Sequence, residues 1–409
     1  MTVAVLAPGS RRLLAAERLR AGTVILLAFM PLGMALANRS APLFVALSAV
    51  LAVAASVAGG DGPVLRVRLR AALGAPLGRA VVLFLLLSAV SIAWSPRPDL
   101  SGHALGEFGL SLGAVLLLAC ALPSSLSRAA PLFAAGIAAA CLVILADFAT
   151  GLEARRLLDR RLGGFIHNRP ALTLLVLLPA AVLLFGPAKR APAAALAALV
   201  AFTILLSESG AAALGFLCGV LTFVAARLAP RAALVLAATG VLLSVLLAPF
   251  LGEAAARLAP ASLHQRLAGA HSAERVEIWR AFGEAARARP FLGSGFGASA
   301  RLHEAPVADA VAPALRLGLA QSHPHNAPLQ IWVELGALGA TLALGVALLT
   351  LKTVAVLPPD RLPPALALFA AAFAVSLVGH GAWQGWWPAA VGAGIVWLRL
   401  ADRWRGEGA

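Results

Sequence analysis

The sequence predicts an all-α polytopic integral membrane protein with about twelve transmembrane helices. Two observations favour this class. Hydrophobic residues make up 61% of the chain and charged residues only 12%, whereas a soluble domain has about 25% charged residues. Apolar runs of about 20 residues also recur along the chain, and each is long enough to cross the bilayer core as a helix. The strands of a membrane barrel would be shorter and would alternate.

Arginine positions then orient the expected spans. With the N-terminus in the cytoplasm, cytoplasmic ends and loops collect most of the basic residues, as the positive-inside rule requires. An even number of spans places both termini inside, in a bacterial inner membrane. The expected spans are residues 21–38, 41–58, 80–95, 107–122, 129–149, 170–186, 192–208, 210–227, 232–251, 327–351, 362–381 and 385–400.

This topology divides the chain into three parts. Residues 1–251 hold the first nine helices and a short basic periplasmic segment, 151–169. Residues 252–326 form a long periplasmic loop between the ninth and tenth helices, and residues 327–409 hold the last three helices. The net charge of +15 does not indicate nucleic-acid binding, because the chain is generally arginine-rich.

Arginines gather in the two periplasmic segments against the positive-inside rule. Arg161 and Arg169 lie in the short segment, and Arg275 and Arg280 lie in the long loop. Clustered guanidinium groups favour an anionic partner, and a phosphate matches their fork best. Contact with anionic lipid headgroups, or plain solvated charge, stays open as the alternative.

The long loop contains a predicted helix from Ser272 to Arg289, ended by Pro290. Its Arg275 and Trp279 share a face at i, i+4 spacing. An amphipathic helix on the membrane surface is the alternative interpretation. The following Gly-Ser-Gly-Phe-Gly stretch, residues 293–297, lacks the lysine of a P-loop and predicts a tight turn.

One motif begins at the end of the loop: His325 and Asn326, then nine residues, then Gly336 and Gly339. It resembles the signature of the O-antigen ligase and polymerase superfamily. The segment from Phe165 to Pro170, the Trp-Arg helix with its glycine-rich turn, and the aromatic stretch 383–387 are also similar to that family. The resemblance covers roughly residues 150–390 and is closest to the O-antigen ligases.

The resemblance implies a GT-C-like glycosyltransferase that moves a glycan from undecaprenyl diphosphate to an acceptor hydroxyl, with inversion. Such a hydroxyl needs a general base, and His325 is the candidate. Asn326 is expected to cap the next helix, so that His325 lies at its positive end. His323 is the competing base or an orienting residue. His323, Asn326 and His167 are further substrate-binding candidates, and Gly336 and Gly339 are expected to pack against a neighbouring helix.

The four candidate arginines, Arg161, Arg169, Arg275 and Arg280, are expected to neutralise the leaving diphosphate. The sequence therefore predicts a metal-independent enzyme without a cofactor. One departure from the family is the stretch Ser207-Glu208-Ser209-Gly210, where many relatives carry an arginine. Arg169 or Arg161 is the expected substitute.

Several functions remain open at this point. An O-antigen ligase would use a lipid A-core acceptor, whereas a polysaccharide polymerase would use a second lipid-linked glycan. A protein O-oligosaccharyltransferase is a third member of the same class. A twelve-span transporter is the rival from another class, but it predicts repeated halves and charges at the midplane. Membrane lipids are expected partners of the chain in every case.

Overall fold

The computed structural model describes residues 8–122, 129–156, 163–185, 189–258, 260 and 272–404. Each of the expected spans overlaps a helix, so the all-helical, multi-pass membrane class is confirmed. Eight helices among the described residues are long and apolar enough to cross a membrane, or up to 9 if a bent pair counts as one span. Two further apolar helices are shorter, at 17 residues each. The count of twelve spans therefore stays a prediction.

The chain divides into two compact units, each assembled from segments that are far apart in sequence. Unit 1 comprises residues 1–72, 110–217 and 385–409, and unit 2 comprises residues 73–109 and 218–384. The three-part division of the sequence stays a prediction, because it sorts residues by membrane side and not by contact. Two helices, α5 (Pro98–Ala121) and α10 (Gly210–Leu228), contribute residues to both units.

Unit 1 is built around α1, which packs against α2 and α6. A Cβ at Gly136 of α6 would collide with the Ala28 carbonyl of α1, so the small residue permits the close helix approach. Phe133 stacks on the buried Trp397 ring, with 4.1 Å between centroids. The helices are α1 (Pro8–Leu36), α2 (Ala41–Ala58), α3 (Gly62–Gly74), α6 (Ala129–Ala149), α7 (Glu153–Arg156), η2 (Gly164–His167), α8 (Asn168–Phe185), α9 (Arg190–Leu206) and α17 (Trp386–Trp404).

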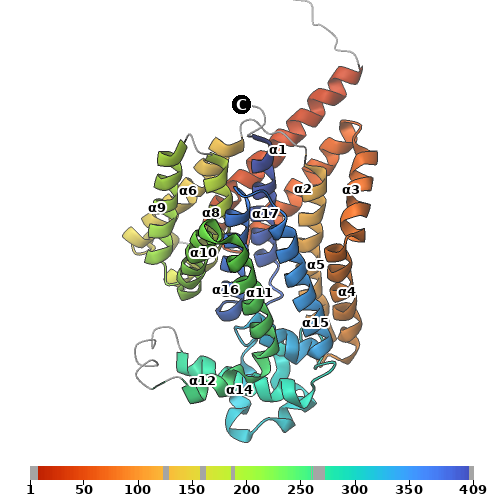
Figure 1. Cartoon of the computed structure of the whole chain (residues 1–409), viewed down its shortest axis with the longest axis vertical. Coiled ribbons are helices and arrows are strands. Elements are labelled where there is room, and N and C mark those ends of the chain that lie inside the picture. The colour runs from red at the N-terminus through yellow and green to blue at the C-terminus, as the bar shows by residue number, and fades with distance from the viewer. Residues whose placement is uncertain are drawn as a thin grey trace, which may run out of the picture. The chain divides into compact units, whose positions relative to one another are not determined.

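Unit 2 is built around α15, which packs against α4, α11, α14 and α16. In Figure 1, α12 and α14 lie across the ends of α11 and α15, and the chain bends by 57° where α11 gives way to α12. The helices are α4 (Pro76–Ser91), η1 (Ile92–Trp94), α11 (Pro230–Leu246), η4 (Ala248–Phe250), α12 (Leu251–Leu258), α14 (Ser272–Ala288), η6 (Ala298–Glu304), η7 (Pro306–Ala310), η8 (Pro313–Ala320), α15 (Ala327–Ala355) and α16 (Leu362–Val378).

Helix α14 confirms the helix expected from Ser272 and rests on a core of its own. Phe282 is fully buried there, with Ile278 and Trp279 packed against the same cluster. Residues of η6, η7 and η8 complete this cluster together with Leu329 and Val333 of α15. Residues 272–320 therefore form a folded layer that holds α14 against the start of α15.

A glycine-rich turn docks onto α15 where that helix is interrupted. Gly293, Gly295 and Gly297 all have positive φ, which confirms the expected tight turn. At Gly336, φ is 61° and ψ is −160°, and the Ala337 N–H donates to the Pro290 carbonyl at 2.7 Å. The expected helix–helix contact at Gly336 is therefore wrong. A side chain there would collide with the Phe291 backbone, so this glycine serves a contact between helix and loop.

Candidate functional site

The His-Pro-His-Asn turn enters α15 through an N-cap. Asn326 has extended backbone, with φ −149° and ψ 108°, and its Oδ1 accepts from the Leu329 N–H at 2.9 Å. Pro328 follows in the first turn, where its missing N–H costs nothing. This geometry confirms the expected cap. It places His325 one residue outside the helix, in left-handed backbone with φ of 53°, which is uncommon for a residue other than glycine.

Three polar side chains converge on consecutive backbone carbonyls at the end of α16. Asn326 Nδ2 donates to the Leu377 carbonyl at 3.1 Å. Arg275 Nη1 donates to the Val378 carbonyl, and His325 Nδ1 lies 2.7 Å from the Gly379 carbonyl oxygen. The last carbonyls of a helix lack partners within it and carry partial negative charge. The end of α16 therefore fixes the histidine and the arginine side by side.

The contact with Gly379 sets the tautomer of His325. A carbonyl oxygen can only accept, so Nδ1 must carry the hydrogen, and Nε2 of the neutral ring keeps its lone pair. Burial lowers the pKa of His325 below its ordinary value; the bond to Gly379 opposes this shift, and the Arg275 charge adds to it. His325 is thus a neutral imidazole near pH 7, with Nε2 able to accept a proton.

His323 has the opposite arrangement. The His325 backbone N–H donates to His323 Nδ1 at 3.3 Å, so the hydrogen of the neutral His323 ring is on Nε2. The two rings lie 4.2 Å apart at 65°. Burial, and then the charges of His325, His380 and Arg275, lower the pKa of His323 to about 3. His323 therefore stays neutral and has no ring lone pair to spare, which favours an orienting role.

Helix α14 supplies both the cation and a clamp on the turn. Arg275 and Trp279 share one face, as their spacing predicted: Trp279 Nε1 donates to the Pro324 carbonyl at 2.9 Å, while Arg275 reaches Val378. Burial lowers the pKa of Arg275, but a guanidinium remains charged at any ordinary pH. Its fork has five N–H donors, and a carbonyl bond occupies one of them without cancelling the charge.

The remaining sequence candidates lie elsewhere. Arg280, roughly 140° around α14 from Arg275, pairs with Glu253 of α12 at 3.2 Å. Arg169 belongs to unit 1, with its guanidinium over the Trp386 ring, 5.5 Å from the centroid. Arg161 lies outside the described residues. The structure thus brings Arg275, His323, His325 and Asn326 together and does not bring Arg280 to them.

His167 is fully buried in a charged cluster of unit 1 that the sequence did not reveal. Its Nε2 lies 3.0 Å from Asp147 Oδ2, and Arg155 Nε lies 2.6 Å from the same oxygen. Arg155 also donates to the Ala35 carbonyl at 2.6 Å. Because its partner is an internal carboxylate, His167 resembles a structural residue more than a ligand for substrate.

Glu334 is a buried residue that the sequence candidates omit. Its carboxylate accepts from Gly297 N and Trp383 Nε1, both at 2.6 Å, and from Gln330 Nε2 at 2.9 Å. Gln330 in turn accepts from the Ala382 N–H at 3.0 Å. This carboxylate ties the glycine-rich turn and the segment after α16 to α15. The one sequence signal that could have identified Glu334 is that it is a single acidic residue within an apolar run.

Metal ligands are not gathered in the part of the chain that the structure describes. No group of three or more His, Cys, Asp or Glu side chains there could hold an ion. The cation held next to His325 is Arg275, because the two side chains contact adjacent backbone carbonyls.

These features define a polytopic helical membrane protein with an oriented imidazole and a guanidinium fixed outside the start of one long span. Residues 194–344 match the family described as O-Antigen ligase. Over these residues the chain is similar to this family, which confirms the resemblance seen in the sequence. The matched stretch includes α14, the His-Pro-His-Asn turn and most of α15.

Curated relatives point the same way. A protein of Rickettsia prowazekii named "Putative polysaccharide ligase" is 26% identical over 256 residues, which is 62% of this chain and 62% of that protein. One of Rickettsia bellii with the same name is 27% identical over 217 residues, or 52% of this chain and 51% of that protein. The chain therefore aligns with less than two thirds of the length of each of these relatives.

Proposed function

We propose that this protein is an O-antigen ligase that transfers a polysaccharide from undecaprenyl diphosphate to a lipid A-core hydroxyl, at the periplasmic face of the bacterial inner membrane. The observation that carries the proposal is the pair of contacts at the end of α16, where adjacent carbonyls hold Arg275 and His325. An imidazole and a guanidinium thus lie within one small site, which supports their proposed roles as base and anion-binding cation. Similarity to the O-antigen ligase family supports a ligase function in general terms.

The proposed reaction is a direct displacement. His325 Nε2 takes the proton of the acceptor hydroxyl while its oxygen attacks the anomeric carbon of the donor sugar. The bond from that carbon to the diphosphate oxygen breaks, and the diphosphate leaves with the electron pair. Arg275 offsets the charge that develops on the leaving group. Attack from the face opposite the diphosphate inverts the configuration.

His323 and Asn326 act in this scheme by placing the base. Asn326 anchors the turn to both α15 and α16, and His323 holds the His325 backbone in its left-handed conformation. Arginine charge replaces a metal ion at the diphosphate, so transfer is expected to survive a chelator. Loss of activity that Mg²⁺ or Mn²⁺ restores would contradict this part of the proposal.

The lipopolysaccharide of a deletion strain separates the ligase from a polymerase with the same donor. Removing a ligase leaves the core without any O-antigen, whereas removing a polymerase leaves a single repeat unit on the core. The expected gel therefore shows unsubstituted core only, restored by the wild-type gene and not by His325→Ala. A ladder reduced to one repeat would assign the protein as a polymerase.

A further inference from the structure

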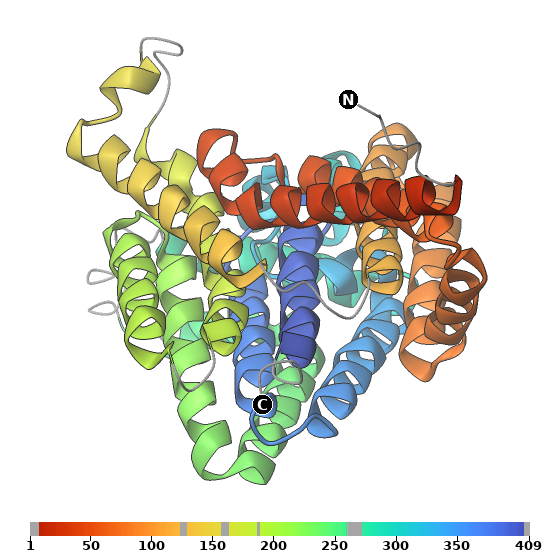
Figure 2. The same cartoon turned by 90° about the horizontal axis from the view of Figure 1, so that it is seen from above.

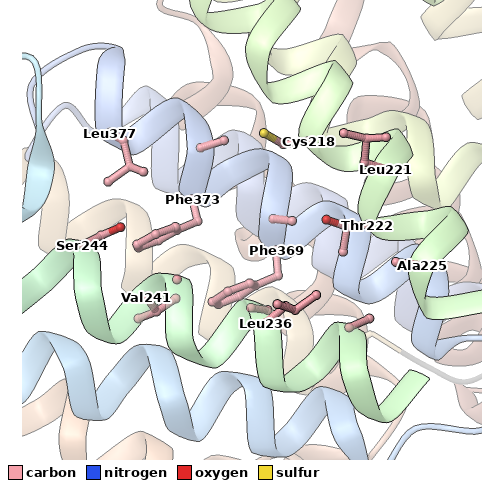
Figure 3. Close-up of a pocket in the computed structure, with 15 residues that line it drawn as sticks. Cys218, Leu221, Thr222, Ala225, Leu236, Val241, Ser244, Phe369, Phe373 and Leu377 are labelled. Atoms are coloured by element: carbon pink, nitrogen blue, oxygen red, sulfur yellow. The ribbon is translucent and has the colours of Figure 1, made fainter. Parts of the chain in front are cut away.

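Helices α10, α11 and α16 enclose a groove of about 380 Å³ within unit 2. Figure 3 shows the Phe369 and Phe373 rings of α16 pointing toward α11, with Cys218 on α10 opposite them. The two rings are nearly parallel, with centroids 6.2 Å apart. We call this space, lined by Cys218, Gly240, Ser244, Phe369, Phe373 and Leu377 among others, the lipid groove. Figure 2 shows its green and blue helices from above.

The lipid groove is apolar and reaches the surface of its unit. No lining residue carries a charge, and the polar groups among them are two hydroxyls and a thiol, those of Thr222, Ser244 and Cys218. Leu221 and Leu236 on its rim are 60% and 69% exposed. In a bilayer such leucines contact hydrocarbon, so the groove opens to acyl or isoprenoid chains and not to water.

One end of the lipid groove meets the candidate site. The groove follows α16 from Phe369 to Leu377, about 12 Å at the helical rise. The Leu377 carbonyl accepts from Asn326, and the next carbonyl, of Val378, accepts from Arg275. An apolar path thus ends next to a guanidinium. This arrangement is complementary to an amphiphile with an uncharged chain and an anionic head.

The chemistry of the two substrates decides which chain fits. In the donor, the isoprenoid is bonded directly to the diphosphate, so its first units lie next to the leaving group. In a glycolipid acceptor, a saccharide separates the reacting hydroxyl from the acyl chains. An apolar groove that ends beside the diphosphate-binding arginine therefore suits the donor.

We infer that the lipid groove binds the first isoprene units of the isoprenoid diphosphate donor and so delivers its diphosphate to Arg275. This inference rests on the proposed function. It assigns α10 and α11 a share in donor recognition, although they contribute no residue to the reaction itself. It also predicts that donor affinity depends on the shape of a groove within the hydrocarbon layer.

Gly240→Phe tests the inference in a transfer assay with a purified lipid-linked donor. A Cβ at Gly240 meets no atom within 4 Å, so the backbone there has room for a side chain that extends into the groove. The KM for the donor should rise about tenfold or more, because the isoprenoid loses buried apolar contact, while kcat changes little. Gly345→Phe on α15 is the matched control, since its Cβ also meets open space and it does not line the groove. An unchanged KM in Gly240→Phe would overturn the inference.

Photocrosslinking gives a readout that does not require turnover. A farnesyl diphosphate probe with a diazirine on its chain should label peptides of α10, α11 and α16. Unlabelled isoprenoid diphosphate should compete with this labelling, and a phospholipid should not. Equal competition by phospholipid, or labelling confined to other helices, would mean an ordinary lipid site and would overturn the inference.

Failure of this inference and failure of the proposed function give different results. If His325→Ala loses transfer while Gly240→Phe keeps it with an unchanged KM, the role of the groove is rejected and the proposed function stands. Wild-type protein inactive in transfer would reject the proposed function.

Discussion

The two units hold one histidine each, the fully buried His167 and the half-buried His325, in opposite ways. In unit 1, His167 and Arg155 both contact one oxygen of Asp147, so a carboxylate offsets the positive charge where it arises. In unit 2, His325 and Arg275 contact the neutral carbonyls of Gly379 and Val378. A carbonyl fixes a side chain without neutralising it. We infer that the type of acceptor, more than the presence of His and Arg, distinguishes the proposed reactive site from the cluster to which we give a structural role.

The largest expected effect is that of Arg275→Ala. Removing the guanidinium should abolish glycan transfer, because Arg275 is the cation that the described residues place at the end of α16, where the proposed diphosphate would leave. Arg275→Lys should recover only part of the activity, since an ammonium lacks the fork. Arg280→Ala, which changes a partly exposed pair on another face of the same helix, should retain most activity. Normal transfer by Arg275→Ala would contradict the reactive role given to the unit 2 arginine, and with it the difference proposed between the two units.

Asp147→Ala should mainly affect stability. It leaves the buried His167 and the partly buried Arg155 without their shared carboxylate, and breaking a buried pair costs about 3–5 kcal/mol. The melting temperature in detergent should fall clearly. Asp61→Ala is the control in the same unit, because its pair with Arg20 is half exposed and such pairs contribute about 0–1 kcal/mol. Equal melting temperatures for both variants would remove the structural role given to the unit 1 cluster.

His323→Ala should have the smallest effect. Its Nδ1 only supports the His325 backbone, so its loss should lower kcat by less than the loss of a base, which is about 10²–10⁴-fold. His323→Asn, which keeps an acceptor on the side chain, should recover part of the rate. A recovery no better than that of alanine would show that the bond to the His325 backbone does not matter.

Sequence patterns predicted the elements that depend on local spacing. Apolar runs located the helices, the i, i+4 pair Arg275 and Trp279 identified the face of α14 that meets the turn, and Asn326 was recognised as a cap. Each of these features is encoded within a few residues, so it can be read without a structure.

The features that could not be predicted from the sequence depend on partners far away in the chain or on backbone groups. The carbonyls of Val378 and Gly379 carry no side-chain signature, and they are 103 and 54 residues from Arg275 and His325. Asp147 was not linked to His167, because the two residues are 20 positions apart and belong to different elements, α6 and η2. In the sequence, the glycine that interrupts α15 at Gly336 looks the same as a glycine that packs two helices together. Only the loop that docks against Gly336 in the structure distinguishes these two roles.

The central claim is that His325 Nε2 is the base, and a transfer assay across pH tests it most directly. The wild-type rate should fall on acidification as the ring takes a proton. Its midpoint should lie below about 6.5, because burial lowers the pKa of His325. His325→Ala should lose about 10²–10⁴-fold in rate and the pH dependence with it, while still binding the isoprenoid diphosphate. A wild-type rate in His325→Ala, or complete loss of transfer in His323→Ala alone, would contradict the account.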